Sequence, residues 1–177
     1  RRNMILDQES IHENVLEVFK NSITNLIESH YTTNDKLTEE DKEEVIEYVN
    51  TNYLKNNKLS LKDIKDKKDS EIRDYIYELI VKDYEDKMLE TPVMNEFEKA
   101  ISLRIIDSNW VEHMNAMEHL KEGIGLRGYG QTNPIQSYTM EGFELFDKML
   151  MNIEETTSQF LLKAEVRQNT ERVQTIK

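Results

Sequence analysis

The sequence predicts an all-α protein whose main feature is a long antiparallel helical hairpin. Apolar residues recur at steps of mostly three or four along residues 94–124 and again along residues 143–164, as one face of a helix requires. Between these stretches, residues 123–134 hold four of the five glycines and one of the two prolines. No segment shows sustained alternation of apolar and polar residues with turn signals, so a sheet is not expected.

The incoming helix of the hairpin is expected to begin after Pro92, because the residue before a proline avoids the helical region. The outgoing helix has two possible starts: Asn133 as N-cap with Pro134 at the first helical position, or Thr139 with Glu141 in the first turn. Each arm has roughly 30 residues, which corresponds to about 45 Å at ~1.5 Å per residue. Several glycines together disfavour a helix, so the loop is expected to span residues 123–134.

Residues 1–30 are expected to carry one further helix. Ser10 and Glu13 have the spacing of a capping box, although a start near Met4 is the alternative. An apolar stripe follows, made of Ile11, Val15, Val18, Phe19, Ile23 and Ile27. His12 and His30 lie on or beside polar faces and are expected to be solvated.

Residues 31–93 are highly charged, and we interpret them as a small helical unit. Thr38 and Asp41 predict the cap of one helix, which carries Val45, Ile46, Val49 and Tyr53. Ser70 is expected to begin a second helix, with Ile72, Ile76, Leu79, Ile80 and Tyr84 on one face. Residues 168–177 have few apolar positions and are expected to be a fraying helix end or a tail.

Composition excludes several classes of function. The net charge is −12, which disfavours nucleic acid as a partner because that binding depends on clustered Lys and Arg. The chain has no cysteine, so it has no disulfide framework and no thiolate metal site. No apolar run approaches the ~20 residues that a transmembrane helix needs, and no signal peptide opens the chain. The chain begins without an initiator methionine, and we interpret it as part of a longer protein.

No residue grouping indicates catalysis. The glycine-rich stretch follows a helix and contains no lysine, unlike a phosphate-binding loop. His113 and His119 are six residues apart, so they lie about 120° apart around a helix of ~3.6 residues per turn and do not converge on a metal. We therefore expect no catalytic residue, no bound cofactor and no metal site in this chain.

Two features of the hairpin are candidate contact sites. Trp110 is the only tryptophan. An ordinary core position is the favoured interpretation for it, and packing against a partner domain is the alternative, with Arg104 and Asp107 fixing its orientation. The loop places Ile124, Leu126 and Tyr129 among glycines at the far end of the hairpin, where apolar residues often contact a partner. Arg127, the only cation there, could contact an anion, whereas Ile124 could instead fold back onto the hairpin.

Residues 103–143 closely resemble the C-terminal part of the SecA family, the bacterial ATPases that drive preproteins through the SecYEG channel. The family pattern is an Arg, an Asp three residues later, a Trp and a His, then Gly-Ile-x-Leu-Arg-x-Tyr-x-Gln, Pro, Tyr and Phe. The corresponding residues here are Arg104, Asp107, Trp110, His113, Gly123, Ile124, Leu126, Arg127, Tyr129, Gln131, Pro134, Tyr138 and Phe143. The strong part of the resemblance covers residues 94–167.

The resemblance implies a division of the chain. Residues 1–30 are similar to the end of the family's long scaffold helix, residues 31–93 to its helical wing, inserted in the scaffold, and residues 94–167 to its two-helix finger. In that family the finger tip contacts the translocating, unfolded preprotein at the channel. The resemblance therefore implies that Tyr129, Leu126, Arg127 and Ile124 are preprotein-binding residues.

The family's first finger helix also packs on the motor domains and restrains ATP hydrolysis. This implies that Arg104, Asp107, Trp110 and His113 belong to a regulatory interdomain contact. ATP and Mg²⁺ would be cofactors of motor domains elsewhere in the parent chain. The implied location is cytoplasmic, peripheral at the inner face of the bacterial plasma membrane. The family often has larger residues at the positions of Gly125, Gly128 and Gly130, so this tip should be more mobile. A stand-alone helical module that dimerises through the hairpin is the alternative.

Overall fold

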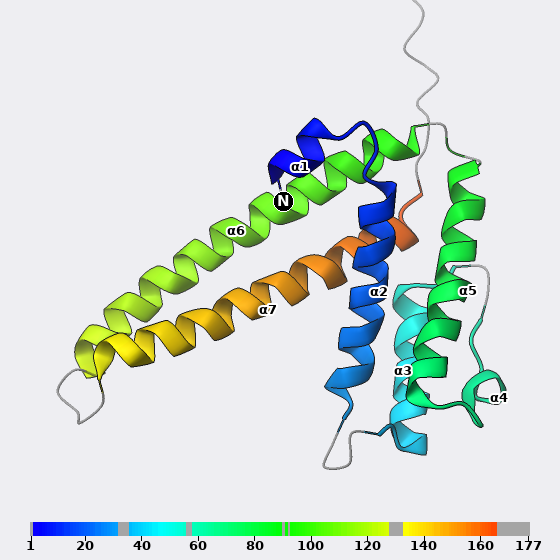
Figure 1. Ribbon diagram of the computed structural model, residues 1–177, viewed down its shortest axis with the longest axis horizontal. Coiled ribbons are helices and arrows are strands. Elements are labelled where there is room, and N and C mark those ends of the chain that lie inside the picture. The colour runs from blue at the N-terminus through cyan, green and yellow to red at the C-terminus, as the bar shows by residue number, and fades with distance from the viewer. Residues whose placement is uncertain are drawn as a thin grey trace, which may run out of the picture.

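The computed structural model describes residues 2–31, 36–55, 58–89, 91, 93–127 and 133–165, with the side chains of residues 125–127 left outside the description. Within these ranges every regular element is a helix, which confirms the predicted all-α class (Figure 1). The elements are α1 (Arg2–Asp7), α2 (His12–Ser29), α3 (Glu39–Asn52), α4 (Leu61–Ile64), α5 (Asp69–Leu89), α6 (Met94–Arg127) and α7 (Pro134–Lys163).

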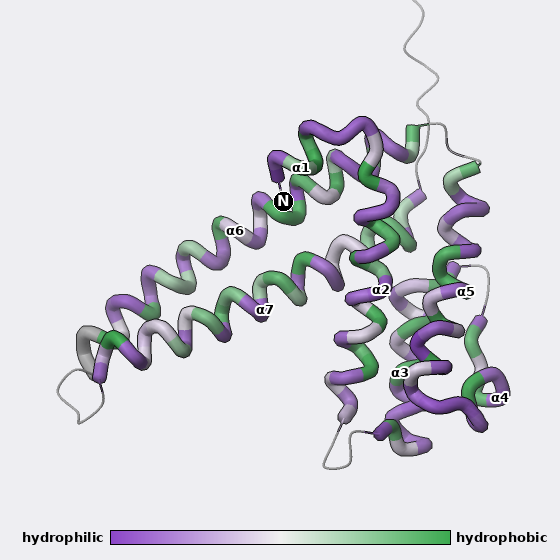
Figure 2. The backbone as a smooth tube through the Cα atoms, in the orientation of Figure 1, coloured by the Kyte–Doolittle hydropathy of each residue, from purple (hydrophilic) through white to green (hydrophobic). Residues whose placement is uncertain are grey.

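Helices α6 and α7 lie side by side and antiparallel, and they extend together away from the rest of the molecule (Figures 1 and 2). They have 34 and 30 residues, so at ~1.5 Å per residue they are about 51 and 45 Å long. The start of α7 matches the first of the two alternatives, because the Asn133 side chain accepts a hydrogen bond from the Ile135 backbone N–H and Pro134 is the first helical residue. Thr139 lies inside the helix and donates to the Ile135 carbonyl.

The predicted start of the loop was wrong. Helix α6 continues through Gly123 to Arg127, five residues into the stretch that the glycines marked as loop. Ile124 is only 6% exposed and continues the apolar stripe of the helix. Burying such a side chain contributes about 1.5–3 kcal/mol, whereas each helical glycine costs about 1 kcal/mol relative to alanine. Packing of this turn therefore offsets its low helix propensity.

Helix α2 contacts α5, α6 and α7, while α1 contacts α6, and α3 contacts α4 and the end of the hairpin in α7 (Figure 1). The stripe of α2 is buried as predicted, except that Val18 is only partly buried. The shared core also contains Val45, Val49, Tyr53, Leu54, Ile64, Ile72, Ile76, Ile80, Tyr84, Leu161 and Leu162. Because α3, α5 and the end of α7 contribute to one apolar cluster, the highly charged residues 31–93 are packed, through their apolar side chains, against the base of the hairpin.

The N-terminal region differs from both predicted helix starts. A short helix, α1, ends at Asp7, and α2 begins at His12. The expected capping box of Ser10 and Glu13 does not form; the Ser10 hydroxyl instead accepts a hydrogen bond from the His12 backbone N–H at 3.3 Å. Ile11 occupies the N-cap position and is buried, so the need to bury this side chain decides where the helix begins.

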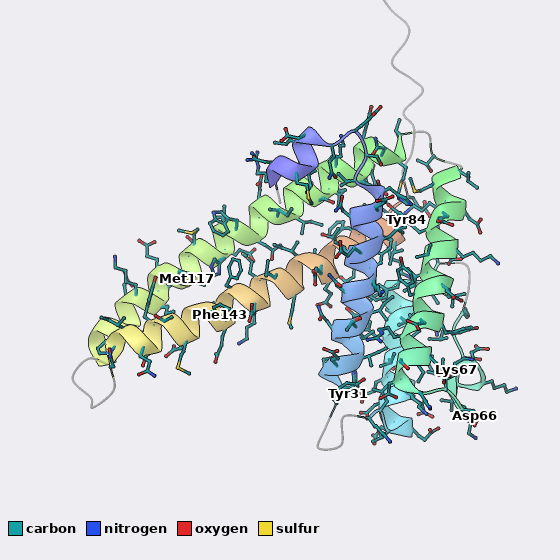
Figure 3. All side chains as sticks on the ribbon, viewed as in Figure 1. Tyr31, Asp66, Lys67, Tyr84, Met117 and Phe143 are labelled. Atoms are coloured by element: carbon teal, nitrogen blue, oxygen red, sulfur yellow. The ribbon has the colours of Figure 1, made fainter. Side chains whose placement is uncertain are left out.

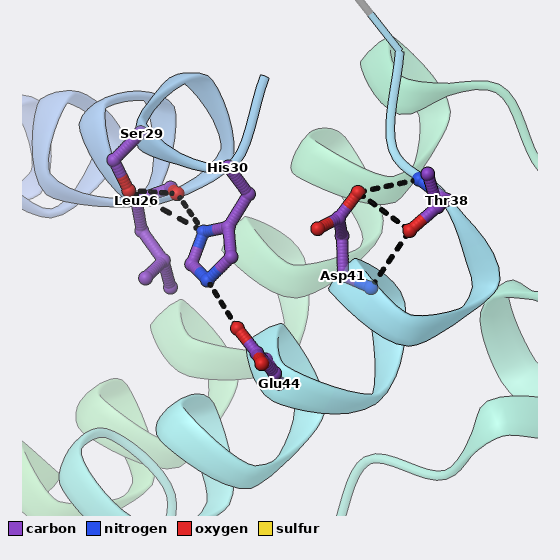
Figure 4. Close-up of polar contacts among 6 residues, drawn as sticks. All are labelled: Leu26, Ser29, His30, Thr38, Asp41 and Glu44. Atoms are coloured by element: carbon purple, nitrogen blue, oxygen red, sulfur yellow. Dashed lines mark hydrogen bonds and ion pairs between the residues drawn. The ribbon is translucent and has the colours of Figure 1, made fainter. Parts of the chain in front are cut away.

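Neither His12 nor His30 is simply solvated, which corrects the expectation from the sequence. His30 lies 2.8 Å from the Leu26 carbonyl through Nδ1 and 3.5 Å from Glu44 through Nε2, so it connects α2 to α3 (Figure 4). The predicted capping box of Thr38 and Asp41 is present beside it. Hydrogen bonds from the Thr38 hydroxyl and backbone lower the pKa of Asp41. Helix α5 begins at Asp69, one residue before the predicted start.

Candidate interaction site on the α6–α7 hairpin

The two hairpin helices are held together by a thin apolar seam with one polar pair. Ile105 of α6 is buried together with Met149 and Ile153 of α7. Beside them, Asn109 is buried, and its side chain donates to the Ile105 carbonyl and accepts a hydrogen bond from the Asn152 side chain. Asn109 is buried, whereas Asn152 is exposed, so a shift along the axis would leave the Asn109 side chain without this donor and the bond favours one register of the two helices.

Near the far end of the hairpin, Gly142 allows the helices to approach closely. A Cβ atom at this position would lie 3.0 Å from Met117 Cε and 3.5 Å from Met117 Sδ. Figure 3 places Met117 on α6 and the neighbouring Phe143 on α7 in this part of the hairpin. Gly142 is therefore an interior helical residue with a packing role.

Trp110 is not a core residue, which corrects the favoured interpretation of the sequence. Its side chain is 49% exposed, and the neighbouring Val111 and Met114 on α6 are also exposed. The ring centroid of His113 lies 5.7 Å from Trp110 on one side and 5.7 Å from Phe146 of α7 on the other. An aromatic cluster, consisting of Trp110, His113 and Phe146, thus spans both hairpin helices.

His113 is the buried member of this cluster. It is 8% exposed, and its Nδ1 atom has no hydrogen-bond partner among the described residues. An unsatisfied buried polar atom is costly unless a partner completes it. The aromatic cluster therefore combines the exposed ring of Trp110 with a buried imidazole that has one unsatisfied nitrogen.

Arg104 and Asp107 are both exposed on α6, where they are separated by less than one turn. Asp107 forms an ion pair with Arg2 of α1 at 3.0 Å, a contact that no local sequence pattern indicates. Arg104 lies in a shallow groove between α6 and α7 whose other lining residues include Glu112 and Phe160. The structure therefore brings Trp110 and His113 together, whereas Asp107 is directed to α1 and Arg104 to the groove.

Helix α7 also exposes an unusual amount of apolar surface. Phe143 is 67% exposed, and the other exposed members are Ile135, Met140, Phe146, Met151 and Phe160. The sequence periodicity assigned Phe143, Phe146 and Phe160 to an apolar stripe, but periodicity alone does not say whether the stripe is covered within the chain. Large apolar side chains left exposed on a projecting helix are typical of interaction sites.

The four predicted tip residues have different fates. Ile124 is buried, which agrees with the alternative that it folds back onto the hairpin rather than contacting a partner. Leu126 and Arg127 form the last turn of the α6 backbone, and their side chains lie outside the described part of the chain. Tyr129 lies outside the described residues as well.

The described residues offer no site for metal chemistry and no membrane span. Within the described ranges no group of three or more His, Asp or Glu side chains could hold a metal ion. Across the same ranges, no helix combines the length and apolar character that crossing a bilayer requires.

Comparison with known proteins agrees with this geometry. The family model described as the SecA wing and scaffold domain matches residues 1–165. The chain is 36% identical over 174 residues to the protein translocase subunit SecA of Clostridium novyi (strain NT), an alignment that covers 97% of this chain. The chain spans 21% of the length of that relative. These matches show that the chain belongs to the SecA family, in which it corresponds to the wing and scaffold domain.

Proposed function

We propose that this chain serves as the mechanical and regulatory part of a protein-translocating motor. In this role, the α6–α7 hairpin is a two-helix finger that contacts the translocating preprotein at the SecYEG channel. The observation that carries the proposal is the shape and surface of the hairpin, because two helices of 34 and 30 residues project from the bundle and expose aromatic side chains. A projecting lever with an uncovered apolar flank is suited to transmitting contact between two partners.

The hairpin offers two separate surfaces, and we assign each a different partner. The tip, with Tyr129, Leu126 and Arg127, contacts unfolded preprotein. An aromatic ring at the tip provides contact area without strict hydrogen-bond requirements, so it suits a substrate of varied sequence. Ile124 supports the tip from within, because its side chain is buried in the hairpin.

The second surface, which we call the flank, consists of the aromatic cluster with the exposed Val111 and Met114 of α6. It contacts the motor domains of the complete protein. Tryptophan is among the residues that most often dominate an interface, and Trp110 is half exposed on a rigid helix. Arg104 adds a charged group on the same helix, in the groove between α6 and α7. ATP and Mg²⁺ are bound by the motor domains, so the flank would act on hydrolysis through contact and not through chemistry of its own.

The proposed setting is the cytoplasmic side of the bacterial plasma membrane, where the complete protein binds peripherally to the channel. Nucleic acid is not among the proposed partners, because the chain has a net charge of −12.

Variants of the complete protein test the two surfaces separately. We expect Tyr129→Ala to lower preprotein translocation and to leave basal ATP hydrolysis largely unchanged, because the tip is remote from the motor contact. Tyr129→Phe is the matched control and should retain translocation, since it keeps the ring. Trp110→Ala should raise basal hydrolysis by weakening the restraining contact. Equal loss of translocation and hydrolysis with Tyr129→Ala would contradict the tip assignment.

A second candidate function is a helical module that dimerises through the hairpin, and the exposed apolar residues of α7 favour it. Sedimentation of the chain over a range of concentrations separates the two proposals. A tight dimer that is disrupted by Phe143→Ser would support the module. A monomer at micromolar concentration would leave the exposed flank for the motor domains.

A further inference from the structure

A buried carboxylate lies where helices α2, α5 and α6 meet. Glu98, in the second turn of α6, is 0% exposed. Its Oε1 atom accepts a hydrogen bond from the Tyr84 hydroxyl of α5 at 2.9 Å and lies 3.0 Å from His12 Nδ1 of α2. Its Oε2 atom is buried and has no hydrogen-bond partner within the described residues. One side chain therefore joins the hairpin to the bundle helices on both sides.

Aromatic packing holds the two partners of Glu98 against each other. The His12 ring is stacked on Tyr84, with centroids 6.1 Å apart and planes 9° from parallel. Phe19 of α2 contacts Tyr84 edge-on at 4.9 Å, and Lys87 Nζ lies 5.9 Å from the centre of the Tyr84 ring. Figure 3 shows Tyr84 between α5 and α2, beside the base of the hairpin. Burial and the neighbouring carboxylate both raise the pKa of Tyr84, so its hydroxyl remains a donor to Glu98.

Burial of Glu98 with these two partners is expected to contribute little to the free energy of unfolding. Taking a carboxylate fully out of water is expensive, and leaving one of its oxygens without a donor adds to the cost. If apolar side chains of similar volume replaced both Glu98 and its donor Tyr84, they would fill the same space without either penalty. Apolar contacts tolerate sliding, however, whereas two hydrogen bonds converging on one oxygen are satisfied over a narrow range of orientations.

We propose that Glu98 is a positioning residue that fixes the angle between the α5 helix, the α2 helix and the base of the hairpin. A second buried carboxylate on the other hairpin helix has a related but distinct role. Glu154 of α7 accepts hydrogen bonds from Asn21 and Asn25 of α2 at 3.1 and 3.2 Å. Through these two bonds Glu154 joins the hairpin to α2, whereas Glu98 joins it to both α2 and α5.

Glu98 lies near the first residue of the continuous helix α6, so a small change of helix angle at Glu98 displaces the far end of the helix by a larger distance. From Glu98 to Arg127, at the end of α6, there are 29 residue steps, which correspond to about 43 Å at ~1.5 Å per residue. On that lever, a swing of about 5° at the base displaces the far end by roughly 4 Å. Small changes in the packing of α5 at Tyr84 would therefore become large movements of the hairpin tip relative to the bundle.

Pulsed electron spin resonance on the complete protein tests this assignment. Nitroxide labels at exposed Lys82 of α5 and exposed Glu118 of α6 report the angle between the two helices as a distance distribution. We expect Glu98→Leu to widen this distribution by several ångströms. The double variant Glu98→Leu with Tyr84→Phe should do so without a large loss of urea resistance, because it removes the buried carboxylate together with the hydroxyl that would be left unpaired. Glu98→Gln keeps an acceptor oxygen for Tyr84 and should retain the narrow distribution.

Two further variants make the result decisive. Tyr84→Phe removes only the hydroxyl that reaches Glu98 and should widen the distribution, even if Glu98→Leu fails to fold. Glu154→Gln, which alters the bonds of α7 to Asn21 and Asn25 of α2, should leave the distance between α5 and α6 unchanged. The proposal is overturned if the distribution is unaltered in Tyr84→Phe and Glu98→Leu, or if it widens only together with a large loss of urea resistance. The measurement involves no translocation assay, so its outcome is independent of the proposed function.

Discussion

Gly123→Ala tests whether the hairpin helix really continues into the glycine-rich stretch. In the structure Gly123 is helical, and a Cβ atom at this position would meet no heavy atom within 4 Å. Alanine is about 0.8–1.0 kcal/mol more favourable than glycine in a helix interior. Gly123 lies four residues before the last residue of α6, where helices fray, so we expect a gain of about 0.5–1 kcal/mol.

Two measurements check this value. In a chain of this size a gain of 1 kcal/mol raises Tm by roughly 2–4 °C, so calorimetry should show a rise of about 1–4 °C. Amide hydrogen exchange in the last turns of α6 should slow by about two- to fivefold, since 1.4 kcal/mol corresponds to a factor of ten. The local measurement is the stronger one, because the end of a projecting hairpin opens without unfolding of the bundle.

Gly142→Ala is the matched control. This glycine is also helical, but a Cβ atom there would lie 3.0 Å from Met117 Cε, so the flexible end of Met117 must move. We therefore expect a smaller gain than at Gly123. If Gly123→Ala instead lowers Tm and accelerates exchange, then Gly123 does not occupy an open helical position and the loop begins where the glycines first indicated.

Two further predictions concern the polar contacts of α7. Asn152→Ala should lower the free energy of unfolding by about 1 kcal/mol, because it leaves the buried Asn109 side chain without its donor; adding Asn109→Leu should recover most of this loss in urea unfolding. Burial lowers the pKa of Lys87, whose ammonium donates to the Leu161 carbonyl at 2.7 Å, from 10.5 to about 8. Between pH 8 and 10.5 the unfolded chain binds this proton and the folded chain does not. The free energy of unfolding of the native protein, relative to that of Lys87→Met, should therefore rise with pH over that range. If the difference between the two proteins does not change with pH, the charge is not buried.

The features that sequence predicted correctly depend on neighbours along the chain. The Asn133 cap with Pro134, and the capping box of Thr38 and Asp41, involve residues no more than three positions apart. The spacing of apolar residues likewise reports which residues share a helical face, so the long helices and the family resemblance were predicted without coordinates, whereas the short helices α1 and α4 were not. For the aromatic residues of the hairpin, the sequence predicted only that they share helical faces. Spacing does not reveal whether another part of the chain covers those faces.

The errors arose where distant residues decide the outcome. Local propensity alone would end α6 at Gly123, but burial of Ile124 in the hairpin extends the helix to Arg127. A lone tryptophan is ordinarily a core residue, yet the antiparallel pairing of α6 and α7 leaves Trp110 half exposed beside His113.

The amino-acid sequence by itself determined the helical class, the long hairpin and membership of the SecA family, because helix periodicity and ordered motifs depend only on the spacing of residues along the chain. Only the tertiary structure decided that His12 of α2 meets Glu98 of α6, which is 86 residues away in sequence, and that Tyr84 of α5 shares the same oxygen. The physical reason is that burial and hydrogen-bond satisfaction depend on the three-dimensional neighbours of a group. Where three helices converge, those neighbours are set by the packing of the whole bundle and not by any local pattern.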